Sequence, residues 1–141
     1  MKIDLIVRGH SRLRPRLPGY SENIRVISLI GRFLEHDRVF HFANNGDPEV
    51  FIGSADWRER NLNERVEIIV PVLDGALRER ISRLLDAALS DNRLAWELES
   101  DGRWTPRRPA DGEAEVNYHD LLMRDATDRS RHGARPWEVM L

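Results

Sequence analysis

Apolar positions in the first half of the chain fall into short stretches separated by turn sequences. Residues 2–7 are almost continuously apolar and rich in branched side chains, which is typical of a strand buried on both faces. Residues 24–30 place Ile24, Val26 and Ile30 at alternate positions, which favours a half-buried strand, with a helix as the competing prediction. The pattern therefore predicts two strands near the start of the chain.

The stretch between these strands, residues 10–23, is predicted to be a basic loop. Pro15, Pro18 and Gly19 interrupt it, so it can sustain neither a helix nor a central strand. The loop leaves the end of the first strand and carries several arginines.

Residues 35–42 and 49–53 form a predicted hairpin. Residues 44–48, with the sequence Asn-Asn-Gly-Asp-Pro, supply strong turn chemistry between them. Residues 65–72 are rich in Val and Ile and form another predicted strand, which stops near Pro71.

The second half opens with the most regular helical pattern in the chain. Asp74 is a suitable N-cap, and the apolar positions after it recur at helical spacing: Leu77, Ile81, Leu84, Leu85, Ala88 and Leu89. Residues 94–98 and 103–105 flank an Asp-Gly pair and predict a hairpin. Residues 116–124 predict a short helix.

Strands followed by a strong helix predict an α/β fold in one domain, residues 1–141. A length of 141 residues fits one domain, since domains most often have roughly 100–150 residues. With 40% hydrophobic and 33% charged residues, the composition is that of a globular protein, and no apolar run approaches the ~20 residues of a membrane span. We expect the polar residues 126–136 to be flexible.

Charge and cysteine content narrow the function classes. The net charge of -2 does not indicate a nucleic-acid-binding protein. Cysteine is absent, which excludes disulfides and thiolate zinc sites and fits a reducing compartment. The opening residues lack the apolar core of a secretory signal. We therefore expect a cytoplasmic protein. Four histidines, His10, His41, His119 and His132, have no spacing typical of a metal site.

Lys2 is the only lysine, so arginine supplies nearly all of the 22 basic side chains. Arginine stays ionised and presents a planar fork of donors that suits phosphate and carboxylate oxygens. A codon bias toward arginine explains the same composition, so only the placement of individual arginines can indicate phosphate binding.

His36 and Arg38 are the first candidates for chemistry. They are two residues apart on a predicted strand, so both side chains are expected on one face. An imidazole beside a fixed cation suits phosphoryl transfer, since it can act on the reacting phosphate while a guanidinium holds the non-bridging oxygens. A surface pair on a hairpin is the alternative interpretation.

Two strand ends offer further candidates. Gly53 and Ser54 close the predicted hairpin, where small residues can let a phosphate approach backbone N–H groups. Arg8 follows the first strand, and ligands of open α/β sheets usually bind at strand ends. An ordinary strand-ending turn explains Gly53 and Ser54 equally well.

Taken together, these segments resemble a specific family. Residues 3–9, 21–28, 31–38 and 52–57 are similar, in order, to the C-terminal domain of the large bacterial polyphosphate kinases. The similarity runs from about residue 2 to residue 92 and weakens over the tail. It implies a phospholipase-D-like fold: a mixed central sheet flanked by helices, with a C-terminal hairpin and short helix.

The resemblance also implies an activity. These kinases reversibly move the terminal phosphate of ATP onto inorganic polyphosphate through a phosphohistidine, with magnesium, between two phospholipase-D-like domains. By the resemblance, Arg8 and His36 contact nucleotide phosphates, with Arg38 and Ser54 beside them, and His36 is an acid or orienting group. The phosphorylated histidine and the magnesium-associated residues belong to upstream domains, so we expect no metal ligands in this chain and no full reaction by it alone.

The expected partners follow from the same resemblance. They are ATP or ADP, polyphosphate and the upstream domains, with no nucleic acid and no transmembrane segment. Formation of a homo-oligomer and membrane association of the complete enzyme are left open. Arg12, Arg14 and Arg16 could line a path for polyphosphate, because arginines attract a chain of dense negative charge, or they could belong to a solvated loop.

Two other functions fit the same residues. A phosphodiesterase or nuclease of the phospholipase-D type would need a second histidine motif or a homodimer that brings two copies of His36 together, and Arg38 stands where such enzymes usually have lysine. A non-catalytic anion-binding module is the second alternative, motivated by the absence of the phosphorylated histidine.

Overall fold

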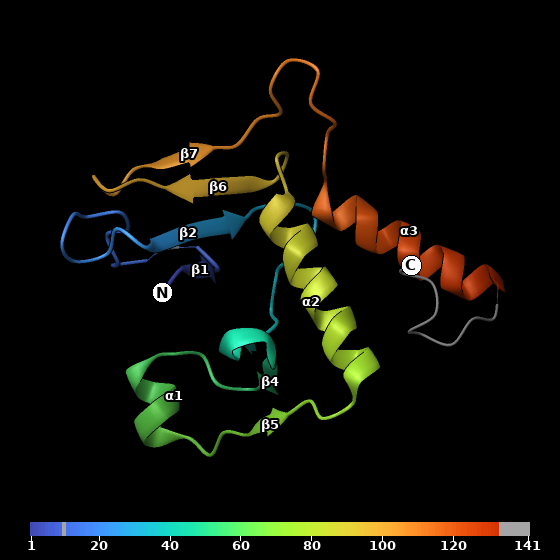
Figure 1. Ribbon diagram of the computed structural model, residues 1–141, viewed down its shortest axis with the longest axis horizontal. Coiled ribbons are helices and arrows are strands. Elements are labelled where there is room, and N and C mark those ends of the chain that lie inside the picture. Colours follow the sequence, from blue (N-terminus) through green and yellow to red (C-terminus); the bar gives the residue numbers. More distant parts are fainter. Residues whose placement is uncertain (10, 133–141) are drawn as a thin grey trace.

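The computed structural model describes residues 1–9 and 11–132 and shows an α/β protein with two separate sheets (Figure 1). The first sheet has the strand order β1-β2-β6-β7 and the second has the order β3-β4-β5. The first comprises β1 (Ile3–Ile6), β2 (Ile24–Leu29), β6 (Ala95–Leu98) and β7 (Trp104–Pro106). The second comprises β3 (Val39–Phe42), β4 (Glu49–Gly53) and β5 (Ile69–Pro71).

The expectation of one central sheet is therefore wrong. The chain leaves the first sheet after Leu29 and enters the second only at Val39. In the described chain, only the ends of the intervening segment form backbone hydrogen bonds with the sheet regions, Ile30 with Leu94 and Arg38 with Gly53. Between them, Phe33 donates its backbone N–H to His119 and Glu35 contacts the same ring. This anchoring to the C-terminal helix separates the two sheets.

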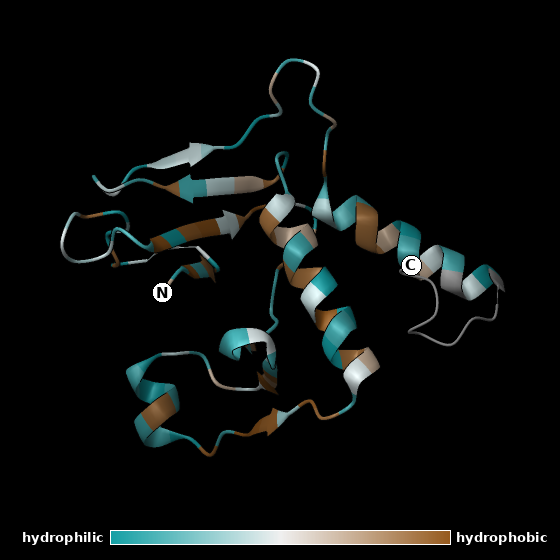
Figure 2. Cartoon of the chain, in the orientation of Figure 1, coloured by the Kyte–Doolittle hydropathy of each residue, from teal (hydrophilic) through white to brown (hydrophobic). Residues whose placement is uncertain are grey.

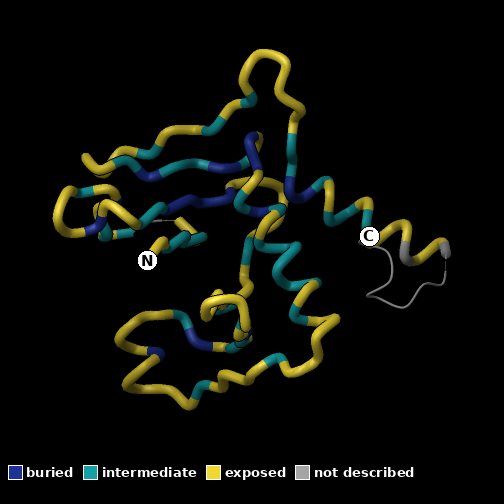
Figure 3. Tube along the Cα trace, in the orientation of Figure 1, coloured by how far each residue is buried: buried dark blue, intermediate teal, exposed yellow. Residues whose placement is uncertain are grey.

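The first sheet is mixed and holds most of the core. β1 runs parallel to β2, whereas β6 is antiparallel to both β2 and β7, which confirms the predicted C-terminal hairpin. Val26, Ile27 and Leu98 are almost fully buried. Figure 3 shows the buried residues concentrated in β2, β6 and the adjoining helix ends.

Helix α2 (Gly75–Ser90) connects the two sheets. It begins at Asp74, whose side chain accepts the backbone N–H of Leu77 at 2.9 Å, as predicted for an N-cap. Near its start, Arg78 donates to the Pro48 carbonyl before β4, and near its end Ala88 packs with Leu29 of the first sheet.

Asp91, directly after α2, is fully buried and joins three elements. Its Oδ1 accepts backbone N–H groups of residues 93, 94 and 95 at 2.6–2.9 Å, and its Oδ2 accepts that of Tyr118 at 2.7 Å. The carboxylate therefore ties the end of α2 to the start of β6 and of helix α3 (Tyr118–His132).

Helix α3 is longer than the helix predicted at 116–124. Residues 126–132 continue it, whereas residues 133–136 lie outside the described residues. The flexibility expected for 126–136 stays a prediction. Among the described helices, none is long and apolar enough to cross a membrane.

The second sheet is antiparallel, and a short 3-10 turn, η1 (Asn44–Gly46), closes the predicted hairpin. Its outer strands are shorter than expected. The predicted strand 35–42 begins only at Val39. The predicted strand 65–72 is reduced to β5; just before it, the Ile68 N–H is donated to the Ser54 hydroxyl and not to a backbone carbonyl. Helix α1 (Glu59–Glu64) lies between β4 and β5. Figure 2 shows that β5 and its flanks are hydrophobic, although they are exposed.

Candidate functional site

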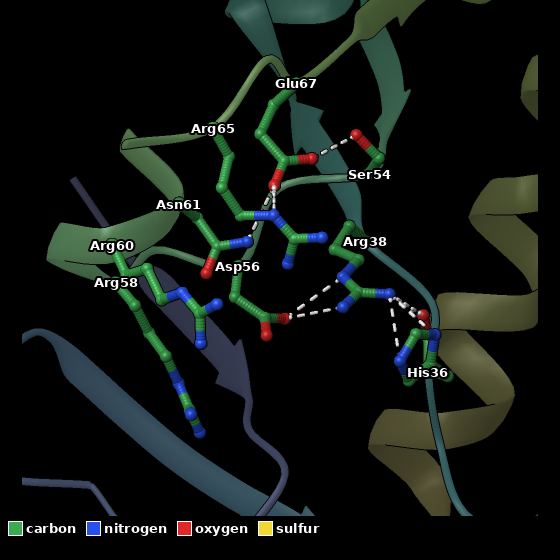
Figure 4. A pocket seen from close by; sticks show the side chains of 9 residues that line it. All are labelled: His36, Arg38, Ser54, Asp56, Arg58, Arg60, Asn61, Arg65 and Glu67. Atoms are coloured by element: carbon green, nitrogen blue, oxygen red, sulfur yellow. Dashed lines mark hydrogen bonds and ion pairs between the residues drawn. The ribbon is translucent and has the colours of Figure 1, made fainter. Parts of the chain in front are cut away.

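A pocket of about 560 Å³ opens beside the second sheet (Figure 4). Its walls come from the segments before β3 and after β4, from α1, and from the chain leading to β5. The lining residues are His36, Arg38, Ser54, Asp56, Arg58, Arg60, Asn61, Arg65 and Glu67. Three of the residues singled out from the sequence, His36, Arg38 and Ser54, therefore meet at one place.

His36 and Arg38 contact each other, but not from a strand as the sequence predicted. Both precede β3, and Arg38 Nη1 lies 2.6 Å from His36 Nδ1 and 2.8 Å from the His36 carbonyl. On its other side, the guanidinium contacts Asp56 Oδ1 through Nε at 3.0 Å and Nη2 at 2.9 Å. The Arg38 side chain is only 16% exposed, so it is a fixed part of the pocket wall.

Arg8 reaches the same cluster from the first sheet. Its Nη2 lies 3.7 Å from Asp56 Oδ2, and its Nη1 donates to the Glu35 carbonyl at 3.4 Å. Arg8 follows β1, so the end of a strand in the first sheet meets the segment that carries His36. Arg8 does not line the pocket, but it lies next to the segment that carries His36, so the assignment of both residues to one site stays a prediction.

Ser54 lies in the pocket, but its hydrogen-bonding groups are already used. The hydroxyl donates to Glu67 and accepts from the Ile68 N–H, and the backbone N–H donates to the Ile68 carbonyl at 3.0 Å. The N–H of Gly53 donates to the Arg38 carbonyl at 3.0 Å. The turn therefore presents no free backbone N–H at these two positions, contrary to the proposed phosphate contact, because both complete the second sheet.

Glu67 is a pocket residue whose carboxyl pKa is lowered by its neighbours. The hydrogen bond from Ser54 contributes most to lowering the pKa of Glu67, followed by the hydrogen bond from Asn61. Arg65 and Arg38 lower it further through their positive charge. Glu67 therefore stays a carboxylate and holds Ser54 and Asn61 in place.

Sequence reasoning missed Arg58 and Arg60. Arg58 is the N-cap of α1 and Arg60 lies in its first turn. Figure 4 draws no dashed contact from either side chain to a carboxylate. Within the described chain, neither guanidinium makes a recorded ion pair. The pair of arginines two apart, directly after the turn at 53–57, was the available signal.

Arg12, Arg14 and Arg16 do not line this pocket. Arg16 pairs instead with Glu97 and Glu99 at the edge of the first sheet, while Arg12 and Arg14 are exposed in the loop after β1. The structure therefore gathers a different set of arginines around His36 from the set suggested by the sequence.

The pocket can bind and orient a polyanion. Four arginines in its lining outnumber two carboxylates, and His36 adds a ring nitrogen that can donate or accept a hydrogen bond. The arrangement suits phosphate oxygens, because guanidinium groups from different segments can share the charge of one phosphate chain.

Comparison with known proteins gives consistent matches. A family model described as polyphosphate kinase C-terminal domain 2 matches residues 1–118. Polyphosphate kinase of Thermosynechococcus vestitus is 59% identical over 121 residues, which cover 86% of this chain and 16% of that protein. Polyphosphate kinase of Streptomyces coelicolor is 50% identical over 135 residues, which cover 95% of this chain and 18% of that protein.

A solved structure matches as well. The crystal structure of polyphosphate kinase from Porphyromonas gingivalis superposes with a TM-score of 0.85 at 41% identity, covering 92% of this chain and 20% of that one. The chain therefore spans about a fifth or less of the length of these relatives.

Proposed function

Since this chain belongs to the polyphosphate kinase family, we propose that it supplies one wall of the phosphate site of an enzyme that reversibly transfers the terminal phosphate of ATP to inorganic polyphosphate. The observation that carries the proposal is the placement of His36 in a pocket lined by four arginines. Family membership favours a phosphotransferase over the two alternative functions considered from the sequence.

Each basic group has a proposed task. Arg8 and His36 contact the phosphates of the nucleotide. In support, Arg8 donates to the carbonyl of Glu35, the residue before His36, and Asp56 pairs with both Arg8 and Arg38, which contacts His36. Arg58 and Arg60 bind the polyphosphate, because their charges are not neutralised by an ion pair within the described chain. Arg12 and Arg14 remain candidates for a more distant part of the polyphosphate path.

The complete enzyme is proposed to contain the rest of the chemistry. The phosphohistidine and the magnesium-associated residues are expected in upstream domains of a phospholipase-D-like pair, so this chain alone should not turn over. Among the residues that the structure describes, no three of His, Asp and Glu lie together as a metal site. The carboxylates of the pocket already contact arginines, and we derive no step through magnesium here.

Location and assembly follow as further expectations. We propose that the enzyme works in the cytoplasm, with ATP or ADP and polyphosphate as its small-molecule partners. A homo-oligomer and association of the complete enzyme with a membrane are open to direct measurement.

A chimaera tests the site in a working enzyme. This chain would replace the matching segment of the T. vestitus kinase, to which it is 59% identical. We expect His36→Ala and Arg8→Ala to lower kcat/KM for ATP by about a hundredfold, as for removal of a preorganised donor. Arg108→Ala, at an exposed arginine outside the pocket, is the control and should change kcat/KM by less than about twofold. Near-normal activity of both pocket variants would contradict the proposal.

Calorimetry tests the purified chain by itself. Titration with polyphosphate should give binding that weakens as salt increases, and Arg58→Ala and Arg60→Ala should each reduce the affinity. Absence of binding by a folded chain would mean that the phosphate site forms only with the rest of the enzyme. Hydrolysis of a phosphodiester substrate by the purified chain would favour the nuclease alternative.

A further inference from the structure

Helix α1 carries two of the cations that line the pocket, but apolar packing does not hold it in place. Arg58 is its N-cap and Arg60 lies in its first turn. Leu62, the single apolar residue of the helix, is 63% exposed, and Asn61 is its one buried residue. A helix of six residues is unstable in water by itself, so another contact has to fix α1 against the protein.

The contact that fixes α1 is polar and runs through Glu67. Asn61 Nδ2 donates to Glu67 Oε1 at 2.7 Å, and the Ser54 hydroxyl donates to Glu67 Oε2. Ser54 also forms two hydrogen bonds with Ile68, one donated by its backbone N–H and one accepted by its hydroxyl. Figure 4 draws the contacts of the Glu67 carboxylate with both Asn61 and Ser54. One carboxylate therefore joins α1 to the end of β4.

The charge of Glu67, taken alone, weakens the binding of a polyanion. The hydrogen bonds from Ser54 and Asn61 lower the pKa of Glu67 most, followed by the charges of Arg65 and Arg38, so the group is a carboxylate at neutral pH. It offsets part of the positive charge that attracts polyphosphate to the pocket. If Glu67 had no other task, its removal would strengthen polyphosphate binding.

The hydrogen bonds of Glu67 act in the opposite direction. A charged acceptor forms stronger hydrogen bonds than a neutral one, so the carboxylate holds Asn61 and Ser54 more firmly than an amide would. Without this attachment, α1 would become ordered only when the ligand binds, and the lost conformational freedom would reduce the affinity. We expect this cost to exceed the repulsion, because it falls on six residues while salt screens the single charge.

We propose that the hydrogen bond between Asn61 and Glu67 anchors α1 in the pocket wall, and that Glu67, although anionic, strengthens polyphosphate binding by keeping Arg58 and Arg60 beside the other pocket arginines. Asn61 and Glu67 are positioning residues in this proposal, since they act through the two arginines. The identity of the ligand rests on the proposed function. The attachment of α1 does not.

Calorimetry of the purified chain with polyphosphate at one salt concentration separates the two effects of Glu67. Glu67→Gln removes a negative charge and weakens the attachment, so binding should become at least about threefold weaker, whereas the charge alone predicts tighter binding. Asn61→Ala changes no charge and removes the anchor, so it should weaken binding about fivefold. Glu64→Gln, at the exposed end of α1 and outside the pocket lining, is the matched control and should leave the affinity within about twofold.

Hydrogen exchange measures the attachment without any ligand. The backbone N–H of Leu62 donates to the Arg58 carbonyl at 3.0 Å within α1. Asn61→Ala should speed the exchange of this amide by about tenfold. The N–H of Val7, which donates to the Ile27 carbonyl in the first sheet, should exchange as in the unmodified chain and so show that the variant is folded. Unchanged exchange at Leu62 would overturn the anchor.

A double substitution tests whether the hydrogen bond itself matters. The amide introduced by Glu67→Gln can accept from Ser54 and donate to the carboxylate introduced by Asn61→Asp, which restores the contact at the original net charge. We expect the double variant to bind polyphosphate within about twofold of the unmodified chain, because the two changes act through one contact. Failure to recover the affinity lost by Glu67→Gln would contradict the anchor.

The outcomes distinguish this inference from the proposed function. If the unmodified chain binds no polyphosphate, the chimaera provides the test: Glu67→Gln and Asn61→Ala should each raise the KM for polyphosphate about fivefold and change kcat by less than about twofold. Tighter binding or a lower KM for Glu67→Gln would overturn the inference and leave the pocket standing as a polyphosphate site. Unchanged affinity and KM for both Arg58→Ala and Arg60→Ala would contradict the proposed function instead, whatever hydrogen exchange shows for α1.

Discussion

The central strands of the two sheets, β2 and β4, are both rich in apolar residues but have different surroundings. β2 buries Val26, Ile27, Ser28 and Leu29, with the side chain of Ile27 completely inaccessible. β4 buries only Val50 among its five residues. Both strands have a hydrogen-bonded neighbour on each side, so strand pairing does not explain the difference. The difference comes from coverage by other elements, because the core cluster around Leu29 includes residues of α2, β6 and α3.

The difference in burial between the two sheets indicates that residues important for stability and residues that line the pocket lie in different parts of the molecule. The first sheet holds most of the buried core, and Arg8, just after β1, contacts Asp56 of the pocket. The second sheet and its neighbours supply every residue that lines the pocket. Substitutions in the first sheet should therefore act on the free energy of unfolding, and substitutions near the second should act first on ligand binding.

The largest expected effect comes from truncating the same residue type in both central strands. Ile27→Ala should lower the free energy of unfolding by about 3 kcal/mol, because it leaves a cavity in a fully packed site. Ile52→Ala, at a residue that is 40% exposed, should cost less than about 1 kcal/mol. Urea unfolding of both variants measures the contrast. Equal losses would show that the second sheet is covered in solution, for example by a second copy of the chain.

Gly31 tests how the core region holds the segment that carries His36. A Cβ at this position would lie 2.7 Å from His119 Nδ1 and 2.8 Å from Leu94 Cδ1, so Gly31→Ala should cost about 1–3 kcal/mol of unfolding free energy. It should also lower activity of the chimaera, since His119 contacts Glu35 next to His36. Gly75→Ala is the matched control, because a Cβ there meets no atom within 4 Å. Unchanged stability of Gly31→Ala would mean that His119 yields without cost.

Regular elements could be predicted from the sequence because their signals are local. The spacing of apolar residues and the Asp74 cap gave α2, and the turn residues at 44–48 gave the hairpin of β3 and β4. The separation into two sheets could not be predicted in this way. It depends on contacts between the segment at 31–38 and His119, which are more than 80 residues apart in sequence.

The site was predictable in part. His36 and Arg38 were found because a short spacing places two chemically apt groups together, and this held even though neither lies in a strand. Arg16 was misleading because the sequence does not show that Glu97 and Glu99 neutralise it. Arg60 was overlooked because the sequence does not distinguish a pocket-lining cation on a short helix from an ordinary solvated one. The structure places Arg60 in the lining of the pocket (Figure 4).

Alkaline pH should weaken the core region through Tyr118. Burial raises the pKa of Tyr118 to about 12, with a further contribution from the charges of Glu35 and Asp37. The unfolded chain loses the phenol proton near pH 10, so between about pH 10 and pH 12 the folded state binds more protons. Stability should therefore be independent of this group below pH 10 and fall as pH rises through that window. Urea unfolding of Tyr118→Phe should lack this part of the decline; an identical decline in both chains would contradict the assignment.

The smallest effect on stability, and the sharpest contrast between regions, comes from two arginines. Arg16→Ala removes partly exposed ion pairs to Glu97 and Glu99, which should cost about 1 kcal/mol and leave polyphosphate affinity unchanged. Arg60→Ala removes a cation from the pocket, so it should leave the free energy of unfolding within about 0.5 kcal/mol and reduce the salt dependence of polyphosphate binding by about one counterion. Urea unfolding and calorimetry at several salt concentrations measure both quantities. If Arg16→Ala weakens binding as much as Arg60→Ala, the polyphosphate path extends over the edge of the first sheet, and the separation of folding and binding between the two sheets fails.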